Sequence, residues 1–192
     1  MKISLSKVSR KISRILMLAL VASACRPLLT TDSLPAKPPS PDQAEPPRLA
    51  PPYRQGKIKI SPPRGWQISR LPRLKYPIFK QDEVTSISVL ETQSPQSLDQ
   101  FIQTNLQSMA IAFPDWQQLA EQTFQTATAL EGKLVVSTSQ QFNQPLYQHY
   151  YFFGNQDQAE TKIVLICSGR KAAAQQLQQI CDASAKTFEI QR

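Results

Sequence analysis

The sequence is poor in the residues on which most enzyme sites depend. Its single histidine, His149, could not form a zinc site alone, because such a site needs three or four converging ligands. Its five glycines are scattered, whereas a phosphate-binding loop needs several glycines close together. No sharp nucleophile turn accompanies His149, so a Ser-His-Asp site is not indicated. The sequence therefore predicts no catalytic residues, no metal site and no cofactor, and an enzyme is the least favoured class.

Long apolar runs are also scarce, and the longest lies near the N-terminus. Five basic residues and no acid occur among residues 1–14, residues 15–21 are apolar, and the small residues 22–24 then lead to Cys25. A basic start, an apolar segment too short to span a bilayer, and small residues at a cleavage point are typical of a secretory signal peptide. We therefore assign residues 1–24 to a signal peptide.

The string Ala22-Ser23-Ala24-Cys25 resembles the lipobox of bacterial lipoproteins, although Ala22 stands where leucine is commoner. The resemblance implies that Cys25 becomes the N-terminal residue and carries lipid. The chain would then be a membrane-anchored lipoprotein whose domain lies outside the cytoplasm, in a periplasm or on the lumenal side of a thylakoid membrane. The alternative is an ordinary secreted protein that is cut near Ala24.

The basic balance of the chain belongs largely to this leader. The net charge is +8, and five of the positive charges lie in residues 1–24, which leaves +3 for the rest. A nucleic-acid-binding protein should carry a large, clustered basic surface on its folded part. We therefore expect no nucleic-acid partner.

Residues 25–52 form a predicted linker behind the lipidated cysteine. Nine prolines and no aromatic residue occur between residues 26 and 52. Proline favours extended, polyproline-like backbone, and a segment without aromatics has little to bury. We expect a disordered spacer here, followed by one domain over residues 53–192.

The domain begins with strand patterns. Residues 57–60 alternate polar and apolar side chains, and a Pro-Pro-Arg-Gly turn leads to residues 66–68, which predicts a hairpin-like start. Further strands are predicted over 84–90, 119–130, 133–142, 146–153 and 161–167. Residues 163–166 are uninterrupted by polar side chains, which indicates a central strand buried on both faces.

Two helices are predicted beside these strands. Ser97 and Gln100 have the spacing of a capping box, and the apolar residues that follow keep helical spacing until Pro114. Residues 171–188 repeat apolar side chains at helical spacing as well. This order predicts an α+β fold in which an antiparallel sheet is covered by helices in an α/β/α sandwich.

Two cysteines lie within the predicted domain, Cys167 at the end of the central strand and Cys181 in the last helix. Disulfides form in extracytoplasmic compartments, and a bond here would close a loop of about 15 residues, which is worth roughly 3 kcal/mol. The alternative is a pair of buried free thiols that act as small apolar side chains. The spacing of the two residues leaves both open.

The order of elements resembles the PsbP-like family, whose α/β/α sandwich also occurs in Mog-type Ran-binding proteins and several bacterial lipoproteins. Three short strings carry the resemblance, namely residues 60–66 with their Pro-Pro-Arg-Gly-Trp, residues 87–89 ahead of Ser97, and residues 184–188 after the last helix. The sequence lacks the acidic or histidine-containing metal clusters of the best-known photosynthetic members. The resemblance implies a non-catalytic domain, since family members include lumenal proteins that associate with photosystem II.

One charge asymmetry points to a contact surface. Residues 54–80 contain eight basic residues and no acid. If they share a face, that face would favour anionic lipid or an acidic protein surface, and the alternative is solvated charge along a sheet edge. The predicted partner contacts are Lys57, Lys59, Arg64, Arg70, Arg73 and Lys75.

We therefore expect a domain that binds or helps to assemble a membrane-associated protein complex. A photosynthetic complex is one candidate for this partner. The alternative is a carrier of small ligands in the cell envelope, with a pocket between sheet and helix. Tyr147, Tyr151 and Phe153 share one face of a predicted strand and would line that pocket. Aromatic side chains of this kind are also ordinary core residues of a sheet.

Overall fold

The computed structural model describes residues 47–141, 144–154 and 160–191. Cys25, the signal peptide and most of the predicted linker lie outside the described residues. The compact unit starts at Pro47, ahead of the predicted boundary at Tyr53. Its first residues pair with a later turn, because Ala50 N–H donates to the carbonyl of Pro62 and Arg64 N–H donates to the carbonyl of Arg48, each at 2.8 Å. Proline keeps its carbonyl acceptor, so this proline-rich stretch can still pair.

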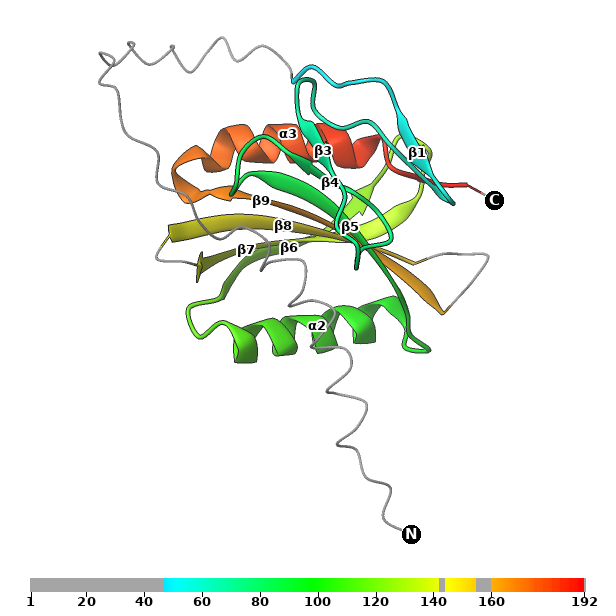
Figure 1. The fold of residues 1–192 in the computed structure, drawn as a ribbon. Coiled ribbons are helices and arrows are strands. Elements are labelled where there is room, and N and C mark those ends of the chain that lie inside the picture. Colours follow the sequence, from blue (N-terminus) through cyan, green and yellow to red (C-terminus); the bar gives the residue numbers. More distant parts are fainter. Residues whose placement is uncertain (1–46, 142–143, 155–159, 192) are drawn as a thin grey trace, which may run out of the picture. The chain divides into compact units, whose positions relative to one another are not determined.

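A seven-stranded antiparallel sheet forms the centre of the unit (Figure 1). Its spatial order is β3 (Gln67–Ser69), β4 (Ile78–Lys80), β5 (Ser86–Gln93), β9 (Thr161–Arg170), β8 (Gln144–Gly154), β7 (Glu131–Gln141) and β6 (Gln117–Gln125). The predicted apolar run of residues 163–166 lies in β9, the middle strand, and its side chains are buried. The prediction of a central strand is confirmed.

Two α-helices of the described chain lie against opposite faces of this sheet (Figure 1). They are α2 (Leu98–Ala112) and α3 (Ala174–Lys186), and a short 3₁₀ turn, η2 (Lys171–Ala173), precedes α3. Adjacent residues of β8 contact the two sides, since Phe152 packs edge-on against Phe101 of α2 while Phe153 stacks on Phe188, just after α3. The antiparallel sheet and the two helices were predicted correctly. The described chain is mostly sheet, however. Each face of the sheet is covered by one helix and not by a full helical layer, so the prediction of an α/β/α sandwich is confirmed only in part.

A second, three-stranded sheet corrects the predicted hairpin. Its order is β1 (Tyr53–Gln55), β2 (Ile58–Ile60) and β10 (Glu189–Ile190). The strand predicted at residues 57–60 therefore pairs with β1 and β10, while the strand predicted at residues 66–68 pairs with β4 in the large sheet. The prediction was wrong because the residues between them, Ser61 to Pro63, are held by other segments. Ser61 N–H donates to Thr187 Oγ1 at 2.8 Å, and Leu49 forms a bridge with Pro63.

Candidate functional site

The two cysteines of the domain lie within bonding distance. Cys167 on β9 and Cys181 on α3 are joined by a disulfide, with Cα atoms 6.0 Å apart and a sequence separation of 14. Both side chains are fully buried. The bond therefore ties the last helix to the middle strand from inside the core.

His149 is buried on the same face of the sheet as this disulfide. It is the direct neighbour of Cys167 across β8 and β9, and its side chain is fully buried. The Tyr151 hydroxyl donates to Asp182 of α3 at 2.5 Å and lies 3.4 Å from Nδ1 of His149. Burial lowers the pKa of His149, and the charge of Asp182 opposes this only in part. His149 is therefore a neutral core residue at pH 7.

The aromatic residues of the proposed carrier pocket are also core. Tyr151 and Phe153 are fully buried and pack edge-on against Phe124 of β6, while Tyr147 is half-buried beside His149. Neither of the two cavities described below is lined by Tyr147, Tyr151 or Phe153. These contacts therefore favour the core role of the three side chains over a role in a carrier pocket.

Part of the basic segment forms a shallow groove beside the three-stranded sheet. The groove has a volume of about 340 Å³ and is lined by Gln55, Arg70, Leu71, Pro72, Leu74, Lys75, Tyr76 and Pro77. The guanidinium of Arg70 donates to the hydroxyl of Tyr53 at 2.9 Å and to Oε1 of Gln55 at 3.3 Å. Gln55 in turn donates to the carbonyl of Lys75 at 2.6 Å. These bonds fix the loop over residues 70–77 against β1.

A carboxylate at the rim of this groove is already engaged. Lys75 Nζ lies 2.7 Å from Glu91 of β5, and the hydroxyl of Tyr76 donates to the same carboxylate at 2.5 Å. Burial alone would raise the pKa of Glu91, but the hydrogen bonds from Lys75 and Tyr76 lower it below its usual value. The pKa of Tyr76 is raised by burial and by Glu91. Glu91 thus stays charged and neutralises Lys75.

The other predicted contact residues occupy different positions. Lys59 on β2 pairs with Glu189 of β10 at 2.8 Å, so its charge is compensated. Arg64 is exposed in the turn that pairs with residues 48–50, Lys57 is exposed in the β1–β2 turn, and Arg73 is exposed in the loop of the groove. Arg70, Arg73 and Lys75 are therefore the predicted contact residues that share the loop of the groove.

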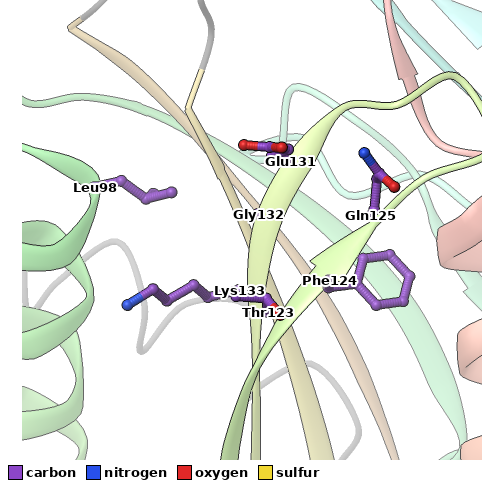
Figure 2. Close-up of a pocket in the computed structure, with 7 residues that line it drawn as sticks. All are labelled: Leu98, Thr123, Phe124, Gln125, Glu131, Gly132 and Lys133. Atoms are coloured by element: carbon purple, nitrogen blue, oxygen red, sulfur yellow. The ribbon is translucent and has the colours of Figure 1, made fainter.

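A larger cavity, which was not anticipated, lies at the end of the β6–β7 hairpin (Figure 2). Its volume is about 500 Å³, and it is lined by Leu98, Thr123, Phe124, Gln125, Glu131, Gly132 and Lys133. Lys133 Nζ lies 2.8 Å from Asp99 and 3.6 Å from Glu121, and the hydrogen bond that Lys133 donates to Asp99 raises the pKa of Lys133. These residues come from three separate elements and form no local motif, so the site could not be predicted from the sequence.

The part of the chain that the structure describes contains neither a metal-binding cluster nor a membrane-spanning helix. Within residues 47–141, 144–154 and 160–191, no three His, Cys, Asp or Glu side chains gather in a way that could hold a metal ion. No helix in the same ranges has the length and apolar character needed to cross a membrane.

Comparison with known proteins bears on the fold alone. No protein-family model and no curated protein matches this sequence. Among solved structures, the cyanobacterial PsbP protein CyanoP from Synechocystis sp. PCC 6803 matches 80% of this chain and 98% of its own, with a TM-score of 0.57 and 10% identity. The fold is PsbP-like. The resemblance to PsbP-like proteins that the sequence suggested is thereby confirmed at the level of the fold.

A second solved structure shares the PsbP-like fold. LpqN of Mycobacterium tuberculosis, described as involved in cell envelope biogenesis, matches 70% of this chain and 83% of its own. The TM-score is 0.54 and the identity is 11%. At such identities the PsbP-like fold is shared, but site residues are not carried over.

Proposed function

We propose that this chain is a membrane-tethered lipoprotein whose non-catalytic, PsbP-like domain binds a membrane-associated protein complex and helps to assemble it. The observation that carries the proposal is the groove beside β1. It lies in residues 54–80, which contain eight basic residues and no acidic residue. Arg54 and Arg73 are exposed in this segment, and Arg70, which lines the groove, is fixed by Tyr53 and Gln55. A positive surface with ordered side chains favours an acidic protein surface as partner.

The proposed location outside the cytoplasm rests on the leader and is supported by the structural neighbours. LpqN is described as involved in cell envelope biogenesis, and CyanoP is a cyanobacterial PsbP. Cys25 would carry the lipid, and residues 26–46 would separate the domain from the bilayer. A photosynthetic membrane is one such location outside the cytoplasm, because PsbP-like proteins include lumenal proteins that associate with photosystem II.

The proposal of a non-catalytic role is supported by the interior of the domain. His149, Tyr151 and Cys167 are of residue types that often act in catalysis, but all three are fully buried in the core. His149 contacts the hydroxyl of Tyr151 and is the cross-strand neighbour of Cys167, which is bonded to Cys181. A catalytic group must touch its substrate. These residues therefore serve the stability of the fold.

The proposal is tested by capture of the tagged full chain from cross-linked membranes of its host. Arg73→Glu reverses a charge in the loop of the groove, and Lys171→Glu reverses an exposed charge at η2, outside the basic segment. We expect the wild type and Lys171→Glu to capture the same membrane complex, and Arg73→Glu to lose most of it. Equal capture by all three proteins, or no membrane protein captured by any, would overturn the proposal.

A further inference from the structure

The strand β6 has a free edge. It is the last strand of the seven-stranded sheet, and within residues 47–141, 144–154 and 160–191 only β7 pairs with it (Figure 1). Every residue of β6 except Phe124 is exposed. On a free edge, alternate residues present backbone N–H and C=O groups outward, and such a row can pair with a further strand.

The composition of β6 does little to prevent such pairing. Edge strands are usually protected by lysine, by proline or by a bulge. β6 contains no Lys, Arg or Pro, and its one irregularity is a register shift between Gln118 and Ala120. Beyond that point the register with β7 is regular from Ala120 to Gln125. Residues 120–125 thus offer a regularly paired, accessible edge.

Charge decides which kind of strand fits this edge. Glu121 is the one charged residue of β6, and Asp99 and Glu131 are exposed beside it. Lys133 lies between Asp99 and Glu121, and its single positive charge can compensate only one of the three negative charges. The surface therefore favours a segment with basic side chains.

The same charge disfavours a second copy of the chain as the occupant. Glu121 is the middle residue of β6, so two fully overlapping antiparallel β6 strands would place Glu121 opposite Glu121. Like charges directly opposite each other destabilise a strand pair. The proline-rich residues 26–46 are also poorly suited, because proline has no N–H to donate to a ladder.

The cavity of about 500 Å³ lies at the C-terminal end of this edge (Figure 2). Thr123, Phe124 and Gln125 of β6 form one wall, and Leu98 at the start of α2 lies across from Lys133. In strand addition, backbone hydrogen bonds give affinity and pockets for alternate side chains give specificity. The cavity is placed to receive a side chain of an added strand.

We propose that residues 120–125 of β6 bind an extended, basic peptide segment of a partner protein by strand addition, with one of its side chains in the neighbouring cavity. This surface is separate from the basic groove. The two sites would recognise opposite charges.

The test uses amide hydrogen exchange of the full chain with a short peptide that alternates lysine and valine, and with its glutamate counterpart. We expect the lysine peptide to slow exchange at residues 120–125, and the glutamate peptide to leave it unchanged. Glu121→Lys places a like charge on the edge and should weaken binding of the lysine peptide by about tenfold or more. Glu83→Lys makes the same charge change on an exposed loop and should bind like the wild type.

Three outcomes would overturn the proposal. The lysine peptide could leave exchange at β6 unchanged, or both variants could weaken binding equally, which would indicate a general charge effect. Protection of residues 120–125 that grows with protein concentration in the absence of peptide would identify a second copy as the occupant. A thermal unfolding midpoint of Glu121→Lys close to that of the wild type is required, because Glu121 also faces Lys133.

Discussion

His149 is a buried base whose hydrogen bonding favours one tautomer. The Tyr151 hydroxyl gives its hydrogen to Asp182, so its oxygen is left to accept from Nδ1–H of His149. Nε2 of His149 has no hydrogen-bond partner among the described residues. A proton added at Nε2 would be buried without a partner, which agrees with the lowered pKa of this side chain.

This arrangement predicts a loss of stability in mild acid. The pKa of His149 is lowered in the folded state by burial, whereas an unfolded histidine titrates near 6.5. Below about pH 6.5 the unfolded chain binds the proton more readily, so the free energy of unfolding should fall as the pH falls. Urea unfolding at pH 7 and at about pH 5 measures this.

Because His149 is the single histidine of the chain, the effect can be assigned to it. His149→Gln should show a flatter dependence of stability on pH between these values, and Tyr147→Phe, a change in a neighbouring ring, should keep the dependence of the wild type. The same slope in His149→Gln and the wild type would show that other groups are responsible.

The disulfide supports a second prediction at the scale of residues. A crosslink between Cys167 and Cys181 constrains the unfolded chain, and a separation of 14 residues corresponds to about 3 kcal/mol in the loop-entropy description. Cys167→Ser should therefore lower the urea midpoint in the absence of reductant. Reductant should lower the midpoint of the wild type but leave that of the variant unchanged.

Thiol counting provides the decisive control. The unfolded, non-reduced wild type should offer no alkylatable thiol from Cys167 or Cys181. Two reactive thiols there, together with identical midpoints with and without reductant, would rule out a bond in solution.

At the scale of elements, the start of α2 depends on a reciprocal cap. Gln100 N–H donates to Ser97 Oγ at 3.3 Å, and Ser97 N–H donates to Oε1 of Gln100 at 3.2 Å. Loss of an N-cap side chain typically costs about 1 kcal/mol. Ser97→Ala should lower the free energy of unfolding by about this amount in urea titrations.

A serine in the interior of the same helix serves as the control. Ser108 Oγ donates to the carbonyl of Thr104 one turn earlier, a bond that does not close the helix end. Ser108→Ala should therefore leave stability unchanged or raise it slightly, since alanine has the higher helix propensity. Equal losses from both substitutions would show that the cap contributes nothing particular.

The elements that the sequence predicted best are those with strong periodicity or clear end signals. The α2 cap at Ser97 and the apolar run of residues 163–166 are local patterns, and both have the structure they indicate. β1, β4 and β10 have three, three and two residues, and no strand was predicted over any of them. Their pairing depends on contacts distant in sequence, such as Glu189 with Lys59.

β6 shows the same limit for the candidate site. Its strand was predicted over residues 119–130, whereas it spans Gln117–Gln125 and a turn follows, with Ala129 at a positive φ of 61°. Its position at the end of the sheet follows from the whole strand order and cannot be derived from its own residues. The cavity beside it could not be predicted for the same reason.

At the scale of the whole molecule, the two surfaces differ in charge and in place. The basic groove lies at the loop over residues 70–77, beside β1, and the acidic edge is β6, the last strand of the large sheet. A domain with two such surfaces could join two partners, which suits a role in assembly. Salt should weaken both contacts, because exposed charges are screened at high ionic strength.

The last prediction concerns how this domain is held at a membrane. The proposed attachment rests on lipid at Cys25, behind the predicted signal peptide. Cys25→Ser removes the thiol that would carry the lipid, and the chain should then move from the membrane fraction to the soluble fraction after a carbonate wash. Ser23→Ala keeps a small residue before Cys25 and should remain in the membrane. If Cys25→Ser also stays in the membrane, another part of the chain holds it there, and the lipoprotein assignment fails.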